Sequence, residues 1–197
     1  MHKSSLDEMQ AFKERYLKGR ENEALLILDL GSLDINGSYK AFFDFPAWTY
    51  KGIDMAEGKN VDIILQDPYR WQNVSSNSAD VVISGQAFEH IEFFWLTILE
   101  IFRVLKPGGL CCLIAPSGGP EHRFPVDCWR FFTDGFSAIA RFASMEILEV
   151  RRKDTSTYTD GSEMWQDVVL VCRKPAASRL FSWKAQIRNY LLTKLLK

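Results

Sequence analysis

Three side chains able to do acid–base or ionic chemistry lie close together in the second half of the chain. His122, Arg123 and Asp127 fall within residues 116–133, which should form a long loop after an apolar run at residues 110–115. Long loops that cover the open end of a sheet often carry function. A histidine titrates near neutrality, so His122 is the first candidate for a general base. Asp127 is the second, as base or as the group that orients His122, and Arg123 is expected to contact substrate. The plain alternative is a lid held by Arg–Asp pairs.

A second set of residues follows four other apolar runs. It comprises Asp29, Gly31, Ser32, Asp54, Met55, Asp67, Ser84, Gly85 and Gln86. In an open α/β sheet, ligands bind beyond the carboxyl ends of the strands. Gly31 allows a sharp turn and close approach of a ligand to the backbone. Asp54 stands about 20 residues after that turn, where an acid accepts hydrogen bonds from ribose hydroxyls. Asp67 is placed to meet an adenine amino group, so the pattern predicts a nucleoside site.

The elements that position these residues are short apolar runs alternating with helical patterns, which indicates βαβ units and a mainly parallel sheet. Strands are expected at residues 24–30, 49–54, 61–65, 79–84, 110–115, 145–152 and 168–173. Helices are expected at residues 6–18, 38–45, 93–105 and 136–142. Ser5 and Glu8 fit a capping box before the first helix. Residues 153–163 are expected to be an exposed connection.

Glu89 and His90 follow the fourth predicted strand and are expected to open the next helix. Acidic residues are favoured at helix N-termini, so Glu89 is interpreted as structural. For His90, packing or lining of the nucleoside site is favoured over direct catalysis.

Composition limits the class of protein. The chain has 197 residues and a net charge of −1, which suits one globular domain and predicts no nucleic-acid partner. No apolar run is long enough to cross a bilayer and the N-terminus lacks a signal-peptide core, so a cytoplasmic location is expected. The four cysteines include no CxxC pair, so no zinc or other metal site is predicted, and they are interpreted as reduced, mostly buried thiols.

The last segment differs from the rest. Residues 1–175 are expected to form the domain, and residues 176–197 a basic amphipathic helix. Its apolar stripe comprises Leu180, Trp183, Ile187, Leu191 and Leu195, with Asn189 among the polar residues opposite. Such a helix suits an anionic membrane surface, which would make the protein peripheral at the inner membrane face. The alternative is that the stripe packs on the domain or on a second subunit.

Four stretches resemble successive motifs of class I S-adenosylmethionine-dependent methyltransferases. They are ILDLGSLDINGSYK, YKGIDMAEGKNVDIILQDPY, ADVVISGQAFEHI and LTILEIFRVLKPGGLCCLIAPSGG, and they occur in the family's order with suitable spacing. The segment PEHRFPVDCWRFFTDGF is similar to a bacterial subgroup often associated with surface-polysaccharide biosynthesis. One departure is that Gly31-Ser32-Leu33-Asp34 replaces the usual GxGxG.

The resemblance implies a fold, a cofactor and a reaction. The fold would be α/β, a Rossmann-like doubly wound, mainly parallel seven-stranded sheet with an antiparallel last strand. S-adenosyl-L-methionine would bind with its methionine part near Asp29 and Gly31, its ribose on Asp54 and its adenine against Met55 and Asp67. Ser84 to Gln86 would line the pocket near the sulfonium. A methyl group would pass to an oxygen or nitrogen of a small-molecule or glycan acceptor.

Two other classes of function stay open at this stage. One is a non-catalytic module that binds S-adenosylmethionine as a partner or regulator. The other is a nicotinamide-dependent oxidoreductase, which Gly31-Ser32-Leu33 disfavours because it breaks the GxGxxG fingerprint of dinucleotide sites.

Overall fold

The computed structural model describes residues 2–176, 187–192 and 194–195. Seven strands form one sheet in the order β3-β2-β1-β4-β5-β7-β6. The strands are β1 (Leu25–Leu30), β2 (Trp48–Asp54), β3 (Ile63–Ile64), β4 (Ala79–Gly85), β5 (Leu105–Ala115), β6 (Glu146–Arg152) and β7 (Val168–Arg173). Strands β3, β2, β1, β4 and β5 run parallel, and β7 is antiparallel to both β5 and β6. The predicted fold class is confirmed.

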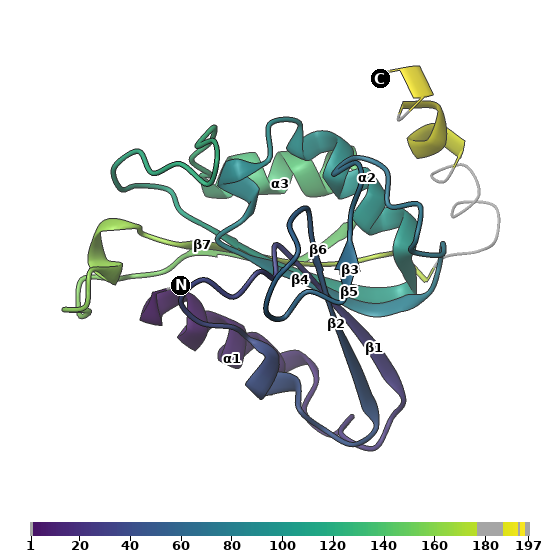
Figure 1. Cartoon of the computed structure of the whole chain (residues 1–197), viewed down its shortest axis with the longest axis horizontal. Helices are drawn as coiled ribbons and strands as arrows, with labels where there is room; N and C mark the ends of the chain where they lie inside the picture. Colours follow the sequence, from purple (N-terminus) through teal and green to yellow (C-terminus); the bar gives the residue numbers. More distant parts are fainter. Residues whose placement is uncertain (1, 177–186, 193, 196–197) are drawn as a thin grey trace.

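Helices cover both faces of this sheet (Figure 1). Helices α2 (Phe94–Val104) and α3 (Thr133–Phe142) lie on one face, and α1 (Lys3–Tyr16) lies on the other. Short 3₁₀ turns are η1 (Lys40–Phe43), η2 (Phe88–His90) and η3 (Ser162–Met164).

The strands are apolar on both faces because each face is covered. Successive side chains of β5 alternate between two buried clusters: Cys111 and Leu113 pack with α2 and α3, whereas Cys112 and Ile114 pack with α1. The two adjacent cysteines therefore point to opposite faces, as expected. Cys128 departs from the expected burial, since it lies exposed in the long loop.

The predicted capping box at Ser5 is wrong. Helix α1 begins earlier, at Lys3, with His2 at the N-cap and no side-chain capping bond. Ser5 and Glu8 are instead buried against the sheet. The Ser5 hydroxyl shares a hydrogen bond of 2.6 Å with the Tyr39 hydroxyl, and Glu8 forms ion pairs with Arg151 and Lys153. Ser5 and Glu8 therefore bind side chains from distant parts of the chain, and they do not cap the backbone amides at the start of α1.

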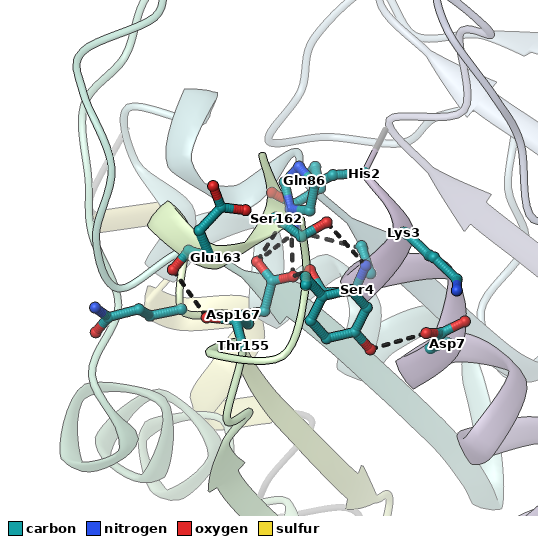
Figure 2. Close-up of polar contacts among 12 residues, drawn as sticks. His2, Lys3, Ser4, Asp7, Gln86, Thr155, Ser162, Glu163 and Asp167 are labelled. Atoms are coloured by element: carbon teal, nitrogen blue, oxygen red, sulfur yellow. Dashed lines mark hydrogen bonds and ion pairs between the residues drawn. The ribbon is translucent and has the colours of Figure 1, made fainter. Parts of the chain in front are cut away.

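The connection at residues 153–163 is not fully exposed as predicted. Thr155 and Ser162 are buried, because this segment packs against the first turn of α1. The Ser4 amide donates to the Ser162 hydroxyl at 3.2 Å, and the Lys3 amide donates to the Asp160 carboxylate at 3.2 Å. Figure 2 shows this contact between two segments far apart in the sequence.

The predicted C-terminal helix is described only at residues 187–192, 194 and 195, which are helical; Leu180 and Trp183 lie outside the described residues. Asn189 is buried and donates to the Ala143 carbonyl, and Arg188 donates to the Phe142 carbonyl at 2.6 Å. The stripe residues Ile187, Leu191 and Leu195 are 38%, 49% and 79% exposed. Asn189 and Leu192 therefore face the domain here, and the stripe residues face outward.

Candidate active site

A cavity of about 1160 Å³ opens at the carboxyl ends of β1, β2 and β4. Its floor is the turn after β1, and its opposite wall comes from η2 and the long loop after β5. Ligands of open α/β sheets bind in this position. Among the predicted site residues, those that line it are Gly31, Asp54, Met55, Gly85, Gln86, His122 and Arg123.

The turn after β1 depends on Gly31. Its φ of +78° lies in the left-handed region, and a Cβ there would stand 2.4 Å from the Ala87 Cβ. The Gly31 amide donates to the Ile53 carbonyl at 2.9 Å, which ties the turn to the end of β2. Glycine is required both by the backbone conformation and by the close approach of the β4 connection.

Asp54 is the last residue of β2, and it lines the cavity. One carboxylate oxygen accepts the Leu33 amide at 3.0 Å and the other accepts the Ala56 amide at 3.1 Å. These contacts fix the carboxylate without burying it, so it can also accept hydrogen bonds from a ligand. Met55, 49% exposed, adds an apolar surface beside it.

Five predicted site residues do not line the cavity. Asp29 and Ser84 lie beneath its floor, where the Ser84 hydroxyl donates to the Leu30 carbonyl at 2.9 Å. Ser32 is buried in the turn. Asp67 accepts the Tyr69 amide at 2.8 Å, and it is Tyr69, rather than Asp67, that reaches the cavity. The fifth is Asp127.

Asp29 is a buried carboxyl that supports the floor. Burial raises its pKa to about 7, although the Tyr50 hydroxyl, which donates to it, works in the opposite direction. Asn60 in turn donates to the Tyr50 hydroxyl at 3.1 Å and to the Ser32 carbonyl at 3.0 Å. These contacts connect β1, β2 and the first turn into one hydrogen-bonded unit.

Asp127 organises the long loop from behind the cavity wall. Arg130 donates to both of its carboxylate oxygens, at 2.6 and 2.8 Å, and the His122 amide donates to it at 2.8 Å. Because Arg130 stabilises the charged form, the pKa of Asp127 is lowered well below its usual range. Such a carboxylate is a poor proton acceptor at neutral pH, so Asp127 is placed to position His122.

His122 and His90 meet at the wall that faces the glycine turn. Their ring centroids are 4.8 Å apart, and both rings line the cavity. Burial lowers the pKa of His122, and nearby His90 adds to this effect, so the imidazole is neutral at neutral pH. The sequence prediction favoured a packing or lining role for His90, and the structure places it in the same cluster as His122.

Glu89 does not sit at a helix N-terminus as predicted, since α2 begins only at Phe94. It lies in η2, fully buried, and neither carboxylate oxygen has a hydrogen-bond partner. Burial raises its pKa to about 8. Perturbed carboxyls of this kind are typical of functional sites.

Sequence reasoning missed the contribution of the N-terminus. His2 and Trp165 line the cavity and stack with ring centroids 5.6 Å apart. Buried Asp167 binds the Ser4 hydroxyl at 2.6 Å, the Gln86 amide at 3.0 Å and the His2 ring at 3.3 Å (Figure 2). Gln86 holds a left-handed backbone, φ 58°, in this network. These partners are up to 165 residues apart, so no local pattern could reveal them.

Comparison with known proteins shows similarity in one segment of the sequence and in the fold. Residues 48–113 match the family model described as a methyltransferase domain, which is about a third of the chain. No curated protein gives a significant match. Among solved structures, the Burkholderia thailandensis 1,6-didemethyltoxoflavin-N1-methyltransferase with bound 1,6-didemethyltoxoflavin and S-adenosylhomocysteine is similar, with a TM-score of 0.66 and 14% identity over 87% of this chain and 79% of that one.

Two further structures extend the comparison. Haemonchus contortus phosphoethanolamine N-methyltransferase 2, in complex with S-adenosyl-L-methionine, has a TM-score of 0.63 at 15% identity over 86% of this chain and 52% of that one. The [4+2]-cyclase SpnF has a TM-score of 0.66 at 17% identity over 87% of this chain and 82% of that one. This chain therefore has the class I methyltransferase fold, and its central segment has a methyltransferase-domain sequence.

Proposed function

We propose that the protein is an S-adenosylmethionine-dependent methyltransferase whose cofactor and acceptor share the cavity at the strand ends. The observation that carries this proposal is a cavity of about 1160 Å³ with two unlike walls. That volume is slightly above the roughly 300–1,000 Å³ usual for a small-molecule site. One wall is the glycine turn with Asp54 and Met55, and the other contains His90, His122 and Arg123.

The first wall fits an adenosine-containing cofactor. Gly31 lets the backbone approach the ligand, the Asp54 carboxylate can accept both ribose hydroxyls, and Met55 offers an apolar surface to a base. S-adenosylmethionine supplies a methyl group on a sulfonium, ready for displacement by a nucleophile. The residues of this wall bind and orient, and positioning of the reactants supplies much of the acceleration.

The second wall fits the acceptor. A hydroxyl acceptor must lose its proton, and neutral His122 stands where it can accept one, with Asp127 and Arg130 holding its loop in place. Arg123 lines the same region and is 72% exposed in its side chain, so it can meet an anionic group of the acceptor. The resemblance of this loop to polysaccharide-associated methyltransferases favours a sugar hydroxyl, free or on a glycan.

A nicotinamide cofactor fits this site less well. Dinucleotide sites place the pyrophosphate at the N-terminus of a helix that follows the first strand directly. Here β1 is followed by a loop and then by the short 3₁₀ turn η1, which begins only at Lys40. The alternative of a non-catalytic S-adenosylmethionine-binding module stays open, since the fold alone does not specify methyl transfer: the fold neighbour SpnF is named as a [4+2]-cyclase.

Two measurements test the proposal. Calorimetric titration with S-adenosylmethionine and S-adenosylhomocysteine should show binding to the full-length protein, and NAD should show none. Incubation with methyl-labelled cofactor and host extract should then label a product. Cofactor binding with no labelled product, together with unchanged biological function in a His122→Ala strain, would favour the binding module instead.

The outward apolar stripe of the C-terminal segment supports a second contact. The described helical residues present Ile187, Leu191 and Leu195 to solvent, while Arg188 and Asn189 hold the segment to α3. We infer that this stripe docks on an anionic membrane, where an acceptor carried on a lipid would be found. None of the helices among the described residues is long and apolar enough to span a membrane. Vesicle flotation of wild type and Leu191→Glu tests this: equal behaviour would contradict it.

A further inference from the structure

Three side chains at the acceptor wall share an arrangement that proton transfer alone does not explain. Glu89, His90 and His122 each present a ligand atom, and these atoms all lie within 4.8 Å of one another. Glu89 and His90 come from η2, after β4, whereas His122 comes from the long loop after β5. Both histidine rings line the cavity, and Glu89 lies behind them.

The cluster has an excess of acceptors and lacks a positive charge. Neither Glu89 oxygen has a hydrogen bond, and the buried Nδ1 of His122 has none either. The two terminal nitrogens of the nearby Arg130 guanidinium donate to Asp127 and to two backbone carbonyls, and its buried Nε forms no hydrogen bond. A buried carboxylate without a partner is costly, and buried charges are normally paired or coordinate a metal.

The orientation of His90 points its other nitrogen into the cluster. Its Nδ1 lies 2.6 Å from the Val126 carbonyl oxygen, and because a carbonyl only accepts, Nδ1 carries the hydrogen and donates it. Nε2 then faces Glu89, and it lies 3.7 Å from Oε1, which is too long for a hydrogen bond. Metal-bound histidines typically donate their second N–H to a carbonyl or carboxylate in this way.

His122 is held through its backbone amide, which donates to Asp127, whereas its Nδ1 forms no hydrogen bond. Its Nδ1 lies 3.4 Å from the Asp127 carboxylate, which is itself held by Arg130. Two imidazoles and one carboxyl group are therefore held side by side.

We propose that Glu89, His90 and His122 form a binding site for a divalent first-row transition-metal cation, and, resting on the function proposed above, that this cation binds the acceptor hydroxyl. Two nitrogens and one oxygen suit such ions better than Mg²⁺ or Ca²⁺, which favour all-oxygen sites. Ligand atoms of a tetrahedral site are about 3.4 Å apart, so side-chain shifts of about 1 Å complete it. Three protein ligands leave a coordination position free, as in catalytic metal sites.

The cation would replace His122 as the means of activating the acceptor. A cation-bound hydroxyl has a lowered pKa and releases its proton to solvent. Its oxygen then forms a bond to the methyl carbon while the carbon–sulfur bond breaks. The electron pair of that bond stays on sulfur, which changes from sulfonium to neutral thioether.

Titration of untagged, chelator-treated full-length protein with Co²⁺ tests the site, by calorimetry and by visible absorption of the bound ion. We expect one equivalent to bind. Glu89→Gln, His90→Ala and His122→Ala should each weaken binding at least tenfold. The matched control is His2→Ala, because His2 is the remaining histidine of the chain, lines the same cavity and pairs with Asp167 outside the cluster.

The results separate this inference from the proposed function. Absence of Co²⁺ binding, or binding that all three variants retain, would overturn the metal site even if S-adenosylmethionine still binds. Asp54→Ala should weaken cofactor binding and leave Co²⁺ binding unchanged. Thermal unfolding of each variant checks that it is folded. If the variant of buried Glu89 fails to fold, His122→Ala provides the test, because His122 lies in a loop and is partly exposed.

Discussion

The buried carboxyl groups next to the two walls of the cavity differ in their hydrogen bonding. Below the cofactor wall, Asp29 is paired with Tyr50, whose hydroxyl is supported by Asn60. Behind the acceptor wall, Glu89 is equally buried and has no hydrogen-bond partner. A partnered carboxyl strengthens the structure, whereas an unpartnered one weakens it until a ligand, proton or cation arrives. A hydrogen-bonded floor therefore lies opposite a wall that is backed by an unpartnered carboxyl group.

The largest effect is expected at the acceptor wall. His122→Ala should reduce methyl transfer by about 10²–10⁴-fold, since a positioned base or activating group contributes this much. S-adenosylmethionine affinity should stay within about twofold of wild type, because His122 lies on the opposite wall from Asp54. Turnover with labelled cofactor and calorimetry measure the two quantities. A variant with near-normal turnover would remove His122 from the reaction.

At the cofactor wall, Asp54→Ala should weaken S-adenosylmethionine binding by about ten- to a hundredfold, since hydrogen bonds to a charged group contribute about 1.5–3 kcal/mol. Asp54→Asn is the matched variant, because it keeps the size and some acceptor capacity. Calorimetric titration of both variants gives the affinities. Unchanged affinity in a folded Asp54→Ala protein would show that the carboxylate does not hold the cofactor.

The unpartnered Glu89 makes stability depend on pH. Its pKa in the folded protein, about 8, is above the ordinary value of 4.5. The contribution of the protonated Glu89 carboxyl to the free energy of unfolding is therefore fully present below pH 4.5, and it is lost as the pH rises through 8. Glu89→Gln removes this loss, and in the presence of chelator it should be roughly 3–5 kcal/mol more stable than wild type at pH 8.5, since one pKa unit is about 1.4 kcal/mol and the two pKa values differ by about 3.5.

Urea unfolding at pH 5 and pH 8.5 measures this difference. At pH 5 the two proteins should be nearly equal, because Glu89 is then protonated in the folded state. A variant less stable than wild type at both pH values would mean that Glu89 has a partner that holds its charge.

The smallest expected effect concerns Asp29, the buried carboxyl that has a hydrogen-bond donor. Tyr50→Phe removes the donor to Asp29 and should lower stability by about 0.5–1.5 kcal/mol, the net contribution of an ordinary hydrogen bond. The sign is opposite to that of Glu89→Gln, so the pair of variants tests the contrast between the two walls directly. The same urea unfolding serves, with Tyr16→Phe, which removes a hydroxyl bound to Glu149 far from the cavity, as a control for loss of a phenol.

Local sequence patterns predicted that Gly31 and Asp54 lie at the same edge of the sheet. Gly31 and Asp54 directly follow apolar strands, and strand ends meet at one edge of a parallel sheet, so their proximity follows from position along the chain. Asp67 was placed less well, because a turn directs it to the Tyr69 amide and brings Tyr69 to the cavity instead.

What the sequence by itself determined is therefore the sheet, its two apolar faces and the identity of the strand-end residues, since these depend on periodicity and on residue type at each strand terminus. Only the tertiary structure decided the acceptor wall and the first turn of α1. Glu89 meets His122 because two loops converge, and Ser5 bonds Tyr39 instead of capping its own helix. Whether a side chain is buried, and which groups it contacts, depends on segments that are distant in the sequence. Local spacing therefore encodes neither property.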